Sequence, residues 1–203
     1  RLVDGYPGER TTVGEVNLGD LPSIASFYGD GDELHMVFNF LPLHAPWTKA
    51  AWRDVMEGVE QVLPAGACPT WALSNHDARR IRTRLGDEDA ARSAAVLLLT
   101  QRGTAFVYQG DELGLEDAVV PTERRIDPGG RDPCRAPLPW EPGDRHGWPT
   151  ASPWLPWPPD ADALNAESER GDAGSMLHLY RALLAARRAS PALRRGAVHL
   201  RDA

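Results

Sequence analysis

Four short apolar segments recur along this chain at a spacing that strongly limits what it can fold into. They are residues 12–18, 34–40, 70–75 and 104–108, and each has the length and composition of a β-strand. Helical patterns lie between the later ones, so the strands should be joined by crossovers and run parallel. A (β/α)8 barrel takes about 250 residues for its eight units. The 203 residues here hold four strands, and we therefore predict an α/β chain that forms half of a barrel.

Three segments are predicted to be helices from the spacing of their apolar residues or from their composition. They are residues 48–64, 89–102 and 175–191. Thr48 is a suitable N-cap for the first helix, and Pro64 cannot continue it. The second is apolar almost all round, so other elements should cover it. The third carries an apolar stripe that includes Leu184, and Arg187 in its last turn favours the negative end of a helix.

Residues 119–160 differ from the rest of the chain in composition. They include eleven of its eighteen prolines and four of its seven tryptophans. So many prolines exclude regular helix or sheet, and a loop this long is usually functional or disordered. Because disordered segments are poor in aromatic residues, we predict that this segment is packed.

Composition excludes several classes of function. The chain has 29 acidic and 22 basic side chains and a net charge of −7, so it should repel phosphate backbones, and no nucleic-acid partner is expected. No apolar run reaches the roughly 18 residues that span a bilayer, so no membrane partner is expected either. Cys68 and Cys134 are far apart and are expected to be free thiols. Few cysteines and no visible secretion signal favour the cytoplasm, with the natural N-terminus expected upstream of Arg1.

Polar clusters follow three of the predicted strands. They are Glu15, Asn75-His76-Asp77 and residues 109–112. In a parallel barrel, the C-terminal ends of the strands form the catalytic face. Two carboxylates that meet there from different strands can cleave a glycosidic bond, because one donates a proton to the leaving oxygen and the other faces the cationic sugar ring. An acidic residue at a strand end is more often a cap or turn residue, so spacing alone leaves a glycosidase as one hypothesis among others.

The residues themselves are more specific than their spacing. The segments are VGEV at 13–16, LSNHDARR at 73–80, GTAFVYQGDELG at 103–114 and DPCRAPLPW at 132–140. In this order they resemble the second half of the catalytic barrel of the α-amylase superfamily, glycoside hydrolase family thirteen. The last segment resembles the Arg-Thr-Pro-Met-Gln-Trp signature of its α-glucosidase and oligo-1,6-glucosidase branch, with three changes. The resemblance implies a partial (β/α)8 TIM barrel of strands five to eight, in which residues 119–160 are a long Pro/Trp-rich eighth βα loop.

The resemblance also implies roles for single residues. Glu15 matches the general acid/base, whose task is to be protonated when substrate binds. Asp77 matches the carboxylate that distorts the sugar and stabilises the transition state, and His76 matches a histidine that hydrogen-bonds sugar hydroxyls. Arg80 matches an arginine near the active-site carboxylates and is therefore assigned to substrate binding, although a salt bridge at a helix start is an equally good interpretation of it. Asp111, by contrast, is expected to fix the eighth-strand loop, as is its neighbour Glu112.

One group of the family's retaining mechanism is missing from this chain. The mechanism needs an aspartate nucleophile, in an Arg-x-Asp context about thirty residues before the acid/base, and only fourteen residues precede Glu15. We therefore expect that strands one to four are missing and that the chain alone hydrolyses nothing measurable. Half a barrel would also expose strand edges and apolar side chains, so the isolated chain should be sticky or poorly folded.

The leading hypothesis is the C-terminal half of a retaining α-glucosidase that acts on short α-linked glucosides. It takes residues 1–190 as half of the catalytic domain and residues 191–203 as a linker and the start of a truncated C-terminal β-domain. Its partners are the glucoside and the missing N-terminal half of the barrel. One alternative is an enzyme of the same family that transfers the sugar, as trehalose synthases and sucrose isomerases do. Another is a non-catalytic carbohydrate-binding relative. No cofactor is expected, because acid/base and nucleophile chemistry needs none. No metal is expected either, because the resemblance implies that the ligands of the structural calcium ion found in some family members lie mainly upstream of this chain.

Overall fold

The computed structural model describes residues 2–201, which divide into two compact units. Among these residues, the first unit comprises residues 2–72, Thr100–Phe106 and residues 190–201, and the second comprises Leu73–Leu99 and Val107–Ala189. The chain returns to the first unit at Ser190, and the predicted division into residues 1–190 and 191–203 stays a prediction. The outer ends of both predicted domains, residue 1 and residues 202–203, lie outside the described part of the chain.

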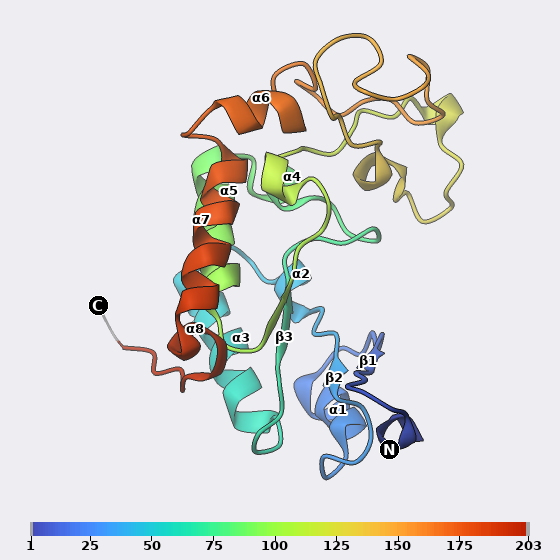
Figure 1. The fold of residues 1–203 in the computed structure, drawn as a ribbon. Coiled ribbons are helices and arrows are strands. Elements are labelled where there is room, and N and C mark those ends of the chain that lie inside the picture. Colours follow the sequence, from blue (N-terminus) through green and yellow to red (C-terminus); the bar gives the residue numbers. More distant parts are fainter. Residues whose placement is uncertain (1, 202–203) are drawn as a thin grey trace. The chain divides into compact units, whose positions relative to one another are not determined.

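The first unit contains short parallel strands and several helices (Figure 1). The strands are β1 (Val13–Gly14), β2 (Met36–Val37), β3 (Thr70–Ala72) and β4 (Thr104–Phe106). The helices are α1 (Leu21–Ala25), α2 (Leu41–His44), α3 (Lys49–Val62) and α8 (Pro191–Arg195), with 3-10 turns at Leu2–Gly5 and Ser26–Tyr28. Strand β1 pairs with β2 and β3 pairs with β4, both in parallel. Each strand lies inside a predicted segment and pairs in parallel, but all four are shorter than predicted, and their numbering as strands five to eight of a barrel stays a prediction.

A threonine side chain links β2 to β3 where a continuous sheet would have backbone hydrogen bonds. The Thr70 hydroxyl donates to the carbonyl of Val37 at 2.7 Å and accepts the backbone N–H of Asn39 at 3.0 Å. Thr70 is buried, so this pair of bonds forms away from water. The described residues therefore form two two-stranded sheets rather than one sheet of four strands.

Helix α3 forms as its sequence predicts. The Thr48 side chain accepts the backbone N–H of Ala51 and caps the helix. The helix ends at Val62, two residues before Pro64. Its apolar face is buried through Trp52, Met56 and Val59.

Gly103 lies in the turn that leads into β4. Its φ is +97°, and a Cβ at this position would lie 2.2 Å from the carbonyl oxygen of Pro69. We predict that Gly103→Ala lowers the free energy of unfolding by about 2–3 kcal/mol, measured from denaturant midpoints. Gly66 is the matched control, because its φ is +83° but open space surrounds it. Equal losses from Gly66→Ala and Gly103→Ala would contradict a steric origin.

The second unit contains the remaining helices. They are α4 (Ile81–Leu85), α5 (Glu88–Thr100), α6 (Ala166–Gly171) and α7 (Met176–Ala189), with 3-10 turns at Asp111–Leu113, Thr122–Arg124 and Asp132–Arg135. Helices α5 and α7 lie side by side in Figure 1, and the guanidinium of Arg187 donates to the carbonyl of Leu99 at 3.1 Å. Arg187 thus lies in the last turn of α7, as predicted, and it is buried. Leu184, expected on the apolar stripe of α7, is exposed.

Residues 119–160 contain only the two 3-10 turns Thr122–Arg124 and Asp132–Arg135, as their prolines predict. They are packed in part. Leu155 is buried in a small apolar cluster with Val120, and the Trp148 indole donates to the carbonyl of Leu138 at 2.7 Å. Trp140, Trp148 and Trp154 are exposed, however, so packing explains only part of the tryptophan content of this segment.

No helix within residues 2–201 combines the length and apolar character needed to cross a membrane. The cytoplasmic location and the absence of a nucleic-acid partner stay predictions.

Candidate active site

His76 and Asp77 project from a tight turn that follows β3. The Asn75 side chain accepts the backbone N–H of Asp77 at 2.9 Å, which closes the turn as asparagine side chains commonly do. The side chain of Asp77 is 37% exposed and that of His76 is 59% exposed. The His76 Nε2 lies 3.5 Å from the Asp77 Oδ2. The two residues predicted to contact a sugar are therefore adjacent and accessible.

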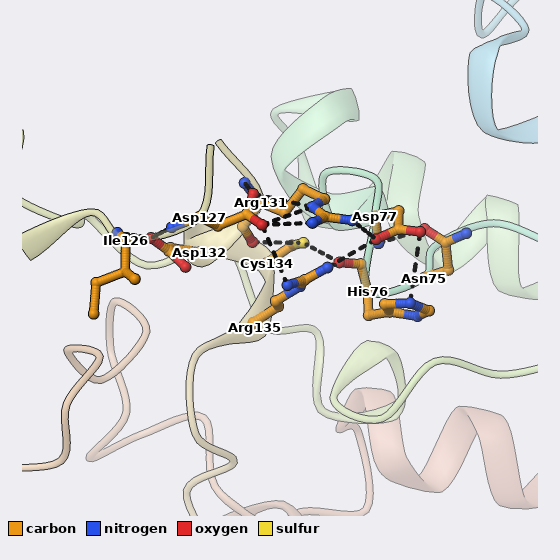
Figure 2. A network of polar contacts seen from close by, with 9 residues as sticks. All are labelled: Asn75, His76, Asp77, Ile126, Asp127, Arg131, Asp132, Cys134 and Arg135. Atoms are coloured by element: carbon orange, nitrogen blue, oxygen red, sulfur yellow. Dashed lines mark hydrogen bonds and ion pairs between the residues drawn. The ribbon is translucent and has the colours of Figure 1, made fainter. Parts of the chain in front are cut away.

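Two arginines contact the same oxygen of Asp77. The Nη1 of Arg131 and the Nη2 of Arg135 each donate to the Asp77 Oδ1 at 2.8 Å (Figure 2). The Nε of Arg135 also donates to the backbone carbonyl of His76 at 2.7 Å. Both arginines belong to residues 119–160, so the Pro/Trp-rich segment supplies direct partners of the predicted site residues.

The arginines are in turn held by Asp127. The Nε of Arg131 lies 3.0 Å from both carboxylate oxygens of Asp127, and its Nη2 lies 2.5 Å from the Oδ1. The Nη1 of Arg135 lies 3.6 Å from the same Oδ1. Asp132 is buried, and its carboxylate accepts the backbone N–H groups of Ile126 and Asp127. Two aspartates and two arginines thus form one connected network with Asp77.

This network favours the ionised form of Asp77. Partial burial of Asp77 opposes ionisation, but the hydrogen bond from Arg131, the charge of His76 and the hydrogen bond from Arg135 outweigh it and lower the pKa. Hydrogen bonds from Arg131 likewise hold the pKa of Asp127 far below its usual range. An ionised carboxylate that keeps one oxygen clear of the arginines can accept hydroxyl hydrogen bonds and face a cationic sugar ring.

A cavity of about 470 Å³ opens beside Asp77 in the second unit. Its lining includes Asp77, Arg79, Asp117, Gly130 and Arg131. Ligand pockets for small molecules commonly have volumes of about 300–1,000 Å³. The neighbourhood of Asp77 therefore offers room for a small polar ligand.

Arg80 is almost fully buried, with 1% of its surface exposed. Its backbone N–H donates to the Asp117 carboxylate at 2.9 Å, at the start of α4. Its guanidinium donates to the carbonyl of Gln109 at 2.7 Å and lies over the Tyr108 ring, 4.8 Å from the centroid. Arg80 thus ties the two predicted polar loops to each other, and the predicted contact with substrate stays a prediction.

The buried cysteine of this region has a packing role. The thiol of Cys134 donates to the carbonyl of Arg131 at 3.1 Å, and burial raises its pKa. Cys134 and Cys68 are both free, as predicted. Within residues 2–201 no group of three or more histidine, cysteine or acidic side chains is arranged to hold a metal ion.

Asp111 is a buried carboxylate near Arg80. Neither of its oxygens has a regular hydrogen-bond partner among the described residues, although the Ser74 hydroxyl is near enough to favour ionisation slightly. Burial raises the pKa of Asp111 to about 7, against the opposing charges of Arg80 and Arg84. The proton is thus bound more tightly in the folded state than in the unfolded chain, where the pKa is about 3.9.

The stability that this group contributes should be fully present below about pH 4 and lost as the pH rises through about 7. We predict that Asp111→Asn flattens the dependence of the unfolding free energy on pH between about 4 and 8, measured by denaturant titrations at a series of pH values. Wild-type and variant curves of equal slope over this range would contradict the assigned proton.

Glu15 lies in the first unit, directly after β1, and is exposed. Its position at the end of a parallel strand is the one that the sequence predicts for an acid/base residue. Asp77 lies in the second unit. The meeting of the two carboxylates at one sugar stays a prediction.

Sequence reasoning did not identify Asp127, Arg131 or Arg135 as site residues. A signal was present, because residues 132–140 match a family signature and Arg135 lies inside it. Asp127 and Arg131 also have the spacing of four residues that suits an ion pair. What the sequence does not reveal is that this segment folds back onto the turn at Asp77.

A family sequence profile described as "Alpha amylase, catalytic domain" matches residues 1–196. A probable alpha-glucosidase of Rhizobium meliloti (strain 1021) is 37% identical over 216 residues, which cover 97% of this chain and 38% of that protein. An oligo-1,6-glucosidase of Parageobacillus thermoglucosidasius is 26% identical and covers 87% of this chain and 39% of that protein.

The structure is similar to a solved enzyme of this group. The crystal structure of the alpha-glucosyl transfer enzyme XgtA superposes with a TM-score of 0.91 and 37% sequence identity, over 100% of this chain and 40% of that one. The chain therefore spans about two fifths of the length of the relatives that it matches.

Proposed function

Because the chain belongs to the α-amylase family of glycoside hydrolases, we propose that it carries the acid/base half of a retaining α-glucosidase that cleaves short α-linked glucosides. In this proposal residues 1–190 form strands five to eight of the (β/α)8 barrel, and residues 119–160 are its eighth βα loop. Residues 191–203 begin the connection to a further domain. The other half of the barrel, with the nucleophile, completes the enzyme.

The observation that carries this proposal is that Asp77 is accessible and that two arginines keep it ionised. An exposed carboxylate on a turn after a parallel strand, kept ionised by Arg131 and Arg135, suits a group that must face positive charge. His76 lies beside it with a largely exposed ring that can hydrogen-bond hydroxyls. A helix cap or turn residue would not need two arginine partners or an accessible neighbour.

The proposed reaction has two steps. Protonated Glu15 donates its proton to the glycosidic oxygen, and the aglycone leaves with that proton while the nucleophile of the other half forms a bond to the anomeric carbon. Asp77 and His76 hold the ring hydroxyls, and the charge of Asp77 stabilises the positive charge that develops on the ring. Water then attacks the anomeric carbon while Glu15 takes its proton, which breaks the bond to the nucleophile and releases glucose with its configuration retained.

A close alternative transfers the sugar to an acceptor in place of water. The similarity to XgtA, described as an alpha-glucosyl transfer enzyme, favours this alternative over a non-catalytic relative. Product analysis of the full-length enzyme with maltose separates the two outcomes. Glucose alone supports hydrolysis, and new oligosaccharides or isomers support transfer.

The proposal predicts that the isolated chain of 203 residues has no measurable activity on nitrophenyl α-glucoside, because the nucleophile lies on the other half. The full-length enzyme assayed at equal concentration should turn the substrate over. Measurable turnover by the isolated chain, abolished by Glu15→Gln, would contradict the proposed division of the active site.

A further inference from the structure

Asp127 is hydrogen-bonded to Arg131 and paired with Arg135, and both arginines contact Asp77 (Figure 2). We propose that Asp127 is a positioning residue, which acts through Arg131 and Arg135 to keep Asp77 in the orientation that binds the sugar. The inference rests on the proposed function and extends it to a residue outside the motifs matched in the sequence.

The donors of Arg131 are divided between two carboxylates. A guanidinium carries five N–H donors in a rigid planar fork. The Nε and Nη2 of Arg131 are directed to Asp127, and the Nη1 is directed to the Oδ1 of Asp77. Because the fork is planar, fixing one edge on Asp127 fixes where the remaining donor points. Asp127 therefore sets both the distance and the direction of the Arg131 contact with Asp77.

Asp127 is itself held in place. The buried carboxylate of Asp132 accepts its backbone N–H at 3.1 Å, and its own side chain accepts the backbone N–H of Arg131 at 2.9 Å. Its carbonyl accepts the N–H of Gly130, whose φ of +70° turns the chain back. The Asp127 side chain keeps only 8% of its surface exposed. An anchor held by backbone hydrogen bonds positions its partners with little freedom.

The division of donors also leaves part of Asp77 accessible. Both arginines contact the Oδ1 of Asp77, while its Oδ2 faces His76. Without the carboxylate of Asp127, the Arg131 guanidinium could turn its paired donors onto Asp77 and occupy the second oxygen as well, as arginine commonly does with a carboxylate. The sugar hydroxyls would then compete with arginine for Asp77. Asp127 thus keeps one oxygen of Asp77 free for substrate.

The test uses the full-length enzyme and nitrophenyl α-glucoside. Asp127→Asn should lower kcat about 10- to 100-fold with a much smaller change in KM, because misplacing a catalytic group by about 1 Å costs about that much. Asp127→Glu should recover part of the loss, since it restores the charge. Asp144→Asn is the control, because Asp144 lies on the same segment, is exposed, and stands outside the network.

A double variant separates positioning from a general structural role. In an Asp77→Asn background, the further change Asp127→Asn should lower kcat less than twofold, because residues that act through one another are not additive. Equal fold losses in both backgrounds, or unchanged kinetics of Asp127→Asn, would overturn the inference while leaving the proposed function intact. Absence of wild-type activity would instead overturn the proposed function. A crystal structure of the Asp127→Asn variant provides a second test. A turned Arg131 guanidinium would support the inference, and an unchanged contact between Arg131 and the Oδ1 of Asp77 would overturn it.

Discussion

Glu15→Gln in the full-length enzyme is expected to lower kcat/KM on maltose about 10²- to 10⁴-fold, the usual contribution of a general acid. Glutamine keeps the shape of the side chain but has no acidic proton to give to the leaving glucose. The loss should be much smaller on an aryl glucoside with an acidic leaving group, because a phenolate departs without protonation. This difference between substrates is specific to an acid catalyst.

The control for this experiment is Glu9→Gln, a change of the same kind at an exposed position in the same unit. It should leave the kinetics on both substrates unchanged. If Glu15→Gln retained near-normal turnover of maltose with an unchanged melting temperature, the acid/base assignment would be wrong.

Asp77→Asn is expected to have an effect at least as large, about 10³-fold or more in kcat/KM, and of similar size on maltose and on the aryl glucoside. In the proposed mechanism the charge of Asp77 faces the ring and not the leaving group, so the acidity of the leaving group should not rescue the variant. In addition, the change leaves Arg131 and Arg135 without their shared partner beside a ring that is becoming cationic. Initial rates with both substrates measure the effect.

The dependence of the loss on leaving-group acidity separates the role of Asp77 from that of Glu15. A loss in Asp77→Asn that depended on leaving-group acidity, as in Glu15→Gln, would contradict its role as a stabiliser of the ring. Asp144→Asn again provides a matched control on an exposed carboxylate. Thermal unfolding of all variants shows whether the fold is retained.

Local sequence patterns predicted the elements whose formation depends on local interactions. Helix α3 has its cap at Thr48 and its end before Pro64, and both signals act within a few residues. The four strands also lie within the segments that their apolar runs predict. The extent of the sheets could not be predicted, because it depends on Thr70, whose side chain bonds to residues more than thirty positions away.

In the candidate site, too, the sequence predicted the locally determined part and not the part that depends on distant contacts. The motif around His76 and Asp77 identified an exposed pair on a strand-end turn, which the structure contains. The partners of this pair come from the Pro/Trp-rich segment, where the sequence fixes no regular structure and therefore no position for Arg131. The burial of Arg80 was not foreseen either, since a charged residue beside a polar motif is usually assumed to be accessible.

A crystal structure of the full-length enzyme with a bound glucose-like inhibitor tests the central claim most directly. We expect one sugar ring to lie within hydrogen-bond distance of both the Glu15 and the Asp77 carboxylates, with an aspartate of the other half facing its anomeric carbon. An inhibitor that contacts only one of these two residues, or carboxylates that open onto different surfaces of the enzyme, would contradict it.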